Sequence, residues 1–136
     1  MKVVIDTNIL VMSIPRKSNL NPIFKSLNEG KFELCITTDI LNEYTEISQR
    51  MLGYEISELV MQALINLPNV IPVITYFSWN LLADADDNKF VDCAVAASAD
   101  FIVTHDKHFN ILNKIQFPQT NLINAEKFMS LLTTIK

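Results

Sequence analysis

The sequence of 136 residues predicts an α/β fold in one domain, with a short, mostly parallel central sheet flanked by helices. Apolar runs of strand length alternate along the chain with longer segments of helical period. Hydrophobic residues make up 49% of the chain and charged residues 19%, which suits a compact domain with one core. Because no repeat, low-complexity tract or linker divides the sequence, we expect a single domain over residues 1–136.

The expected strands are short apolar runs. Residues 3–5 form a continuous β-branched run, which is typical of a central strand covered on both faces. Further strands are predicted at 34–36, 70–75, 101–103 and 122–123. Pro72 interrupts the third of these runs and therefore favours a position at the edge of the sheet.

The expected helices lie at 21–28, 38–52, 57–66, 87–99 and 125–132. The second begins at Thr38 or Asp39, both good capping residues, and ends before Gly53. Helical spacing predicts that this helix packs through one apolar stripe, made of Ile40, Tyr44, Ile47 and Met51.

Composition excludes several classes of protein. Apolar stretches are too short to cross a bilayer and the first strand is no signal peptide, so we expect no membrane contact. Cys35 and Cys93 show no CxxC spacing, which argues against a zinc site and favours the reducing cytoplasm. The net charge of −4 argues against a simple nucleic-acid-binding module, but not against an enzyme whose carboxylates bind cations.

Acidic residues follow two of the predicted strands directly. Asp6 comes immediately after residues 3–5, and Asp106 lies just beyond residues 101–103. The carboxyl ends of parallel strands meet at one edge of the sheet, where ligands bind in open α/β folds. These two carboxylates are therefore the first candidates for a site.

Other acids are candidates with competing interpretations. Glu43 lies at the margin of the apolar stripe of its helix, where it reaches either the sheet edge or solvent. The run from Asp84 to Asp87 opens the helix that carries Asp92, and acids in a first turn often only cap the helix. The choice among Asp84, Asp86, Asp87 and Asp92 stays open.

Several carboxylates at one sheet edge repel each other unless cations compensate them. Ligands that are all oxygen suit Mg²⁺ or Mn²⁺. Two such ions can assist the hydrolysis of a phosphodiester. The placement of the acids thus indicates a metal-dependent hydrolase.

The assembled motifs resemble those of the PIN domain family, and more narrowly its VapC-type toxin ribonucleases. Val-Ile-Asp6-Thr7-Asn8 is similar to the first motif and Leu41-Asn42-Glu43 to the second. The segment from Asp86 to Ala94 and the Thr104-His-Asp106 ending are similar to the third and fourth. The similarity covers essentially the whole chain in order and spacing. Where many relatives have glycine before the fourth motif, this chain has Ser98.

The resemblance implies a PIN-like nuclease domain that hydrolyses RNA with Mg²⁺ or Mn²⁺. Asp6, Glu43, Asp87 and Asp106 would be the catalytic metal-holding acids, with Asp92 as a candidate fifth ligand. Thr7, Asn8 and Thr104 would support them by hydrogen bonding. The resemblance also implies a small antitoxin partner that covers the acidic site, and a homodimer.

Other residues receive structural interpretations. His105 and His108 flank Asp106, but two histidines are too few for a zinc site. The aromatic group of Tyr76, Phe77 and Trp79 is expected in the core rather than in base stacking. Five cations lie near the motifs and could hold phosphates, but each is interpreted as a solvated surface charge: Arg16, Lys17, Lys25, Lys89 and Lys107.

Three other functions compete with the toxin nuclease. One is an RNA-processing nuclease without an antitoxin, and another is a non-catalytic or regulatory PIN-fold module that binds RNA or protein. A phosphate-handling receiver domain also clusters acids at strand ends. It is disfavoured, because it needs an acid pair after the first strand and an aspartate phosphoacceptor on a middle strand.

Overall fold

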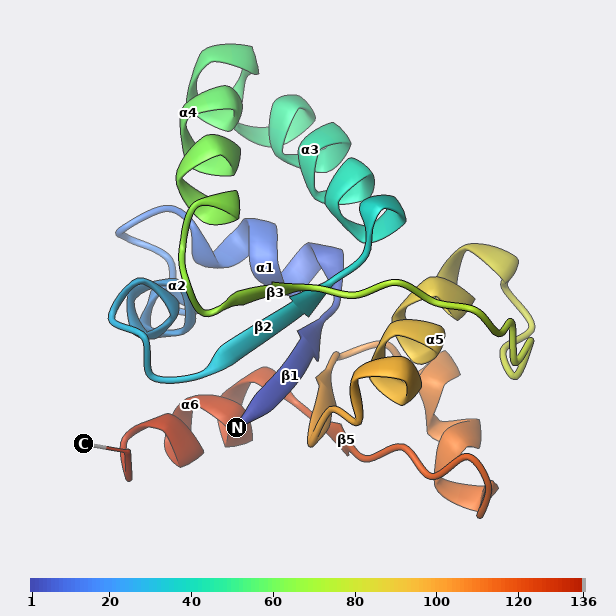
Figure 1. Ribbon diagram of the computed structural model, residues 1–136. Coiled ribbons are helices and arrows are strands. Elements are labelled where there is room, and N and C mark those ends of the chain that lie inside the picture. Colours follow the sequence, from blue (N-terminus) through green and yellow to red (C-terminus); the bar gives the residue numbers. More distant parts are fainter. Residues whose placement is uncertain (136) are drawn as a thin grey trace.

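The structure, a computed structural model that describes residues 1–135, is built on a five-stranded sheet in the order β3-β2-β1-β4-β5 (Figure 1). Every neighbouring pair of strands is parallel. The predicted single α/β domain with flanking helices is confirmed. Lys136, the last residue of the predicted domain, lies outside the described residues. The strands are β1 (Lys2–Ile5), β2 (Glu33–Ile36), β3 (Val70–Pro72), β4 (Phe101–Val103) and β5 (Leu122–Ile123).

The first strand, β1, forms the centre of the sheet, as its apolar run predicts. It pairs with β2 on one side and with β4 on the other. Val3, Val4 and Ile5 have no exposed surface. Burial on both faces explains why this run shows no alternation of apolar and polar residues.

The path of the chain through the sheet reverses beside β1. From β1 the chain passes outward through β2 to β3, and then crosses to β4 and β5 on the other side. In open parallel sheets, ligands bind at the carboxyl ends of the strands where the order reverses. The residues that follow β1 and β4 therefore lie at the favoured edge.

Six α-helices and two short 3₁₀ helices surround the sheet within residues 1–135. The helix α5 contacts β1, β2 and β4, and α3 packs beside α4 as a hairpin standing off the sheet (Figure 1). None of the described helices is long and apolar enough to cross a bilayer. Their bounds are α1 (Thr7–Ser13), α2 (Asn21–Asn28), α3 (Thr38–Leu52), α4 (Tyr54–Ile65), η1 (Ala85–Asp87), α5 (Asn88–Ala97), η2 (Lys107–Lys114) and α6 (Ala125–Leu132).

Three of these helices, α1, η1 and η2, are absent from the sequence prediction. The helix α1 begins at Thr7, directly after β1, and has seven residues, so it is too short to show a helical period. The 3₁₀ helix η2 follows β4 with a different period. The helices α1 and η2 both start beside a candidate acid, where the sequence pattern predicts only the end of a strand.

Two predicted helix boundaries are wrong for reasons of backbone geometry. The helix α4 begins at Tyr54, not at 57, because Gly53 alone separates it from α3 with a φ of +86°. The helix α5 ends at Ala97, not at 99, because Ser98 adopts the left-handed conformation with a φ of +53°. That conformation favours glycine.

The predicted apolar stripe of α3 is half correct. Ile40 and Tyr44 are fully buried, whereas Met51 is 55% exposed. The third buried position is Ser48, whose hydroxyl hydrogen-bonds the hydroxyl of Ser57 on α4. The buried face of α3 therefore continues toward α4, through a polar contact that apolar periodicity does not detect.

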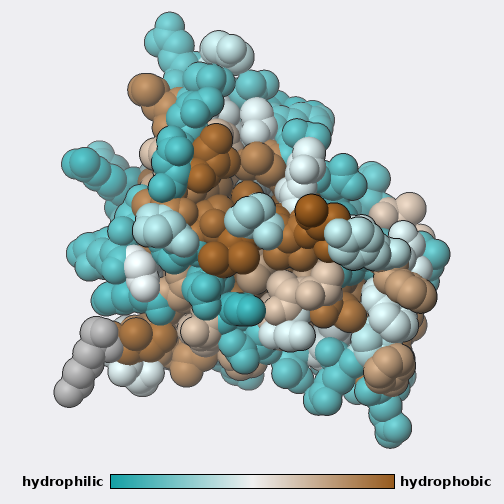
Figure 2. Space-filling view, viewed as in Figure 1, coloured by the Kyte–Doolittle hydropathy of each residue, from teal (hydrophilic) through white to brown (hydrophobic). Residues whose placement is uncertain are grey.

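The strand β3 lies at the edge of the sheet, as Pro72 predicts, but it ends at that proline and not at residue 75. Figure 2 shows apolar side chains gathered across the middle of this face, over β3 and the adjoining end of α4. Ile65, at the end of α4, and Ile74, just beyond β3, are large exposed apolar residues. The chain after β3 thus runs along the surface.

The aromatic residues after β3 do not belong to the core, which corrects the sequence interpretation. Tyr76 is 89% exposed and Phe77 70% exposed. Phe77 stacks on Trp79 with ring centroids 5.3 Å apart, and Trp79 meets Phe117 edge-on at 5.8 Å. The side chain of Trp79 thus contacts two other aromatic rings, those of Phe77 and Phe117, outside the core.

One buried hydrogen bond joins the end of β1 to α3. The hydroxyl of the fully buried Tyr44 donates to the carbonyl oxygen of Ile5, the last residue of β1. Burial raises the pKa of Tyr44 well above its ordinary value, so the hydroxyl keeps its proton. This bond holds α3 against β1, the strand that directly precedes Asp6.

Replacing Tyr44 by phenylalanine should lower the free energy of unfolding by about 1–2 kcal/mol, because a buried carbonyl loses its hydroxyl donor. Urea denaturation followed by circular dichroism measures the change. Tyr54→Phe is the matched control, since Tyr54 is 67% exposed and should be nearly neutral. Equal stability of the two variants would contradict a structural role for the Tyr44 hydroxyl.

Candidate active site

A cavity of about 790 Å³ opens at the carboxyl edge of the sheet, and we call it the acidic cavity. All four acids proposed as catalytic line it: Asp6, Glu43, Asp87 and Asp106. They come from four separate parts of the fold, namely the ends of β1 and β4, the helix α3, and the start of α5. The fold thus brings together carboxylates that lie as many as 100 positions apart in the chain.

Thr104 connects the two acids at the strand ends. Its hydroxyl donates to Asp6 Oδ2 over 2.8 Å and accepts from the backbone N–H of Asp106 over 3.0 Å. The backbone N–H of Asp6 in turn donates to the carbonyl oxygen of Val103 over 3.0 Å. These contacts fix Asp6 relative to Asp106, and they place Thr104 where a supporting hydrogen bond was predicted.

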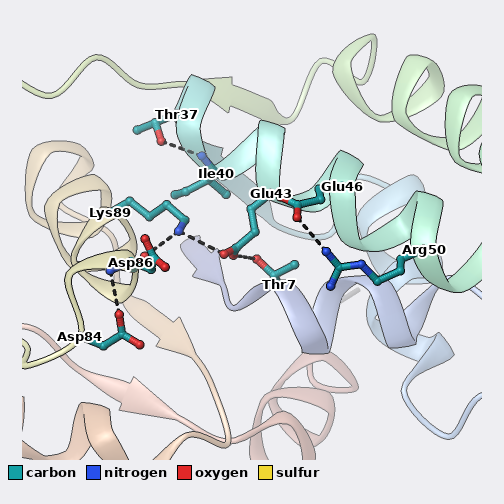
Figure 3. A network of polar contacts seen from close by, with 9 residues as sticks. All are labelled: Thr7, Thr37, Ile40, Glu43, Glu46, Arg50, Asp84, Asp86 and Lys89. Atoms are coloured by element: carbon teal, nitrogen blue, oxygen red, sulfur yellow. Dashed lines mark hydrogen bonds and ion pairs between the residues drawn. The ribbon is translucent and has the colours of Figure 1, made fainter.

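Glu43 reaches the cavity from α3, instead of extending into solvent. The hydroxyl of Thr7 donates to one carboxylate oxygen, and Lys89 Nζ lies 3.1 Å from the other (Figure 3). The Lys89 ammonium group also donates to the carbonyl oxygen of Asp86 over 2.6 Å. Lys89 lines the neighbouring cavity at Asp86 and pairs with Glu43, so it is not a solvated surface charge.

The structure separates the roles of the acids in the run before α5. Asp84 caps η1, because its carboxylate accepts from the backbone N–H of Asp86 over 2.9 Å (Figure 3). Asp86 is exposed and lines a neighbouring cavity. Asp87 precedes α5 but makes no capping bond with its side chain, and it lines the acidic cavity. Of these three acids, Asp87 alone faces the candidate site.

Asp92 and Asn8 have different surroundings from the other predicted residues. Asp92 is not among the residues that line the acidic cavity, and its carboxylate accepts from the backbone N–H of Trp79 over 3.0 Å. It anchors the surface segment that carries the aromatic rings. Asn8 lines the cavity and is exposed, without a side-chain hydrogen bond to any residue in the described range 1–135.

Burial, together with the nearby acids, raises the pKa values of Asp6 and Asp87. Burial, more than any other cause, raises the pKa of Asp6, and the charges of Asp106 and Glu43 add to the shift. The pKa of Asp87 is raised to about 6, first by burial and then by the charges of Asp84 and Asp106. The two carboxylates are thus destabilised as anions, which is the condition that a bound cation relieves.

The donor set of the acidic cavity fits a hard divalent cation such as Mg²⁺ or Mn²⁺, because the groups are all carboxylate oxygens. In the arrangement described for residues 1–135, no three His, Cys, Asp or Glu side chains stand close enough together to hold a metal ion. Glu43 is drawn toward Lys89 instead. The chemistry of the donors fits, while their spacing is wider than a coordination sphere.

Four polar residues at or beside the site have no role in the sequence prediction: His105, His108, Glu126 and Lys89. Glu126 and His105 line the acidic cavity, and His105 Nε2 lies 2.9 Å from Glu126 Oε2. Glu126 follows β5 closely, so the strand-end rule that selected Asp6 could have found it. Lys89 lies two residues after Asp87, but no sequence signal shows that it pairs with Glu43. His108 contacts Asp106 Oδ1 over 2.8 Å at the cavity margin.

Comparisons with known proteins identify the family and the fold of the chain. The family model described as PIN domain matches residues 2–108. No curated protein sequence matches the chain. Several solved structures are similar in fold, among them the following three.

The first is VapBC2 from Rickettsia felis bound to a DNA fragment from its promoter, with a TM-score of 0.64 and 17% identity over 91% of this chain and 98% of that one. DNA-bound VapBC from Salmonella typhimurium has a TM-score of 0.65 and 17% identity, covering 92% and 98% of the two chains. The PIN domain of human SMG5 has a TM-score of 0.58 and 11% identity, covering 96% and 99%.

The match to the family model spans most of the chain, and the five-stranded parallel sheet is the architecture that these structures share with it. The chain belongs to the PIN domain family.

Proposed function

We propose that this PIN domain is a metal-dependent endoribonuclease and the toxin of a toxin–antitoxin pair. One observation carries the proposal: Asp6, Asp87 and Asp106 line a single cavity at the edge where the strand order reverses, and burial and mutual repulsion raise the pKa values of Asp6 and Asp87. RNA as the substrate follows from the resemblance to VapC-type ribonucleases. The similarity in fold to VapBC structures supports the toxin role.

Asp6, Asp87 and Asp106 are the proposed ligands of Mg²⁺ or Mn²⁺, and Glu43 joins them from α3. When bound, such an ion supplies Lewis-acid assistance to the attack of water on an RNA phosphodiester. Thr104 orients Asp6 through its hydroxyl, and Thr7 orients Glu43. Asn8 is exposed in the cavity, and its free amide is available to the RNA. Asp92 serves chiefly to hold the segment at Trp79.

Lys89 balances charge in this proposal. Its side chain is 17% exposed and its ammonium group pairs with Glu43, so one of the four acids is already compensated without metal. The remaining three carboxylates carry the unbalanced charge. Lys89 thus limits the electrostatic cost of the metal-free site and leaves Asp6, Asp87 and Asp106 as the main attraction for a divalent ion.

A second wall of the acidic cavity suits the proposed antitoxin. Ile9, Met12, Leu20 and Ile47 line it beside the acids, and Met12 is 49% exposed. A small partner that presents an apolar helix face and a basic side chain would complement both walls.

The homodimer implied by the resemblance stays a prediction, which the mass of the protein in solution tests. Cys35 and Cys93 are both free, as expected for a protein of the reducing cytoplasm.

The proposed activity predicts cleavage of RNA that depends on Mg²⁺ or Mn²⁺ and stops in EDTA. Asp6→Asn should reduce the rate by at least about a hundredfold, since even residues that only support a metal ligand contribute 10- to 100-fold. Gel analysis of structured and single-stranded RNA measures the rate. Asp100→Asn is the matched control, because it removes one charge from an exposed residue outside the cavity, just before the opposite end of β4.

Three outcomes separate the competing functions. Cleavage lost in Asp6→Asn and retained in Asp100→Asn supports the nuclease. Bound metal without cleavage of any RNA would leave the non-catalytic binding module instead. Purification of the protein from its native host with a small inhibitory partner distinguishes a toxin from an RNA-processing nuclease, which has none.

The raised pKa of Asp87 predicts a specific effect of pH on stability. Between the ordinary carboxyl pKa near 4 and about 6, the folded protein binds more protons than the unfolded chain, so the Asp87 contribution to stability falls as pH rises through this range. Asp87→Asn should therefore have a higher melting temperature than the wild type at pH 8, without metal, and a similar one at pH 4. Mg²⁺ at pH 8 should raise the melting temperature of the wild type more than that of the variant.

Asp86→Asn is the control for this experiment, since Asp86 lies outside the acidic cavity. A difference between Asp87→Asn and the wild type that stays constant from pH 4 to pH 8 would show that Asp87 is not destabilised by its charge.

A further inference from the structure

Besides the mainly acidic cavity at Asp86, which shares Glu43, two cavities that carry cations share lining residues with the acidic cavity. The first, of about 540 Å³, lies among the loop before α2, α2 itself and α6, and it shares Ser18 and Asn19 with the acidic cavity. The second, of about 600 Å³, lies between η2 and the start of α6, and it shares His105, Asp106 and Glu126. The acidic cavity is therefore bordered by two cavities that carry cations.

The first flanking cavity is basic, in contrast to the chain as a whole. Arg16, Lys25 and Lys31 line it, and Glu29 is the one acid on its lining. Arg16 and Lys25 are exposed, and within residues 1–135 none of the three cations forms an ion pair. The floor includes the buried residues Ser26 and Leu132. Charge that no acid of the protein neutralises is thus available to an anionic ligand.

The second flanking cavity is lined by cations and amides, beside the two acids, Asp106 and Glu126, that it shares with the acidic cavity. Lys107 and Lys127 contribute positive charge, and Asn110 and Asn113 contribute exposed side-chain amides. Lysine ammonium groups and asparagine amides are common partners of phosphate and sugar oxygens in nucleic-acid complexes. Groups suited to a polynucleotide backbone therefore occur on both sides of the acids.

We propose that a single-stranded RNA backbone runs through all three cavities, with phosphates held by Arg16 and Lys25 on one side and by Lys107 and Lys127 on the other. This path rests on the proposed function and assigns residues to substrate binding. Asp6 is recessed at the end of a buried strand, so the phosphate that is cut must enter the acidic cavity. A flexible single strand can bend into the cavity more readily than a duplex. Contacts to phosphates hold the backbone without reading its sequence.

The salt dependence of RNA binding tests this path. Fluorescence anisotropy with a labelled, unstructured RNA, in EDTA to prevent cleavage, gives Kd over a series of salt concentrations. The double variants Arg16→Gln with Lys25→Gln, and Lys107→Gln with Lys127→Gln, should each bind more weakly. Each should reduce the slope of log K against log salt by about 1.4, since each phosphate contact to a single strand contributes about 0.7.

The matched control is the double variant Lys2→Gln with Arg50→Gln. It also removes two cations, but neither residue lines any of the three cavities. Its slope should equal that of the wild type. All the variants should keep the wild-type melting temperature, because the replaced cations are surface residues.

The outcomes separate the path from the proposed function. If the wild type cleaves RNA while either flanking variant binds RNA like the control, the path is wrong and the nuclease proposal stands. Such a result would assign that flank to an acidic partner protein. If both flanking slopes fall as expected but no RNA is cleaved with metal, the path holds and the nuclease proposal fails.

Discussion

The burial of β1 between two parallel neighbours is the constraint on which the site depends. Three consecutive side chains without exposed surface fix the position of this strand, and Asp6 is the first residue that leaves it. Parallel pairing brings the end of β4 to the same edge, so Asp106 lies beside Asp6 even though 100 positions separate them in the chain. The hydroxyl of Tyr44 attaches α3, and with it Glu43, to the same strand end. Packing in the core therefore decides where the carboxylates converge.

Convergence of acids opposes folding, and the structure offsets part of that cost locally. Thr104 donates a hydrogen bond to Asp6, which favours its charged form against the effect of burial. Lys89 compensates Glu43, and it is held in place by the carbonyl oxygen of Asp86. Asp87 makes no capping bond with its side chain, and burial, followed by repulsion from Asp84, Asp106 and Asp6, raises its pKa to about 6. The site is thus partly neutralised by the protein and keeps an affinity for an added cation.

The sequence predicts the strands and the strand-end acids of this site better than it predicts the contacts between side chains. Val3, Val4 and Ile5 identify the central strand because complete burial leaves a continuous apolar run, and Asp6 and Asp106 follow from strand ends alone. The pairing of Lys89 with Glu43 is not predictable, since it depends on how α5 packs near α3, and no local pattern records that distance. The surface position of Phe77 and Trp79 was mispredicted for a related reason. Aromatic residues usually pack in a core, but the end of β3 at Pro72 releases this segment onto the surface.

The negative net charge acquires a different meaning once its distribution is known. Acids concentrate in a cavity at the sheet edge, whereas Arg16, Lys25 and Lys31 line the adjoining cavity with one acid among them. The net charge averages these two fields over the whole chain. In salt water, however, each field acts mainly within about 10 Å of its own charges. A polyanion approaching this face meets attraction at the flank and repulsion at the centre. A divalent cation in the centre would reverse that repulsion, so metal and RNA would assist each other's binding through charge alone.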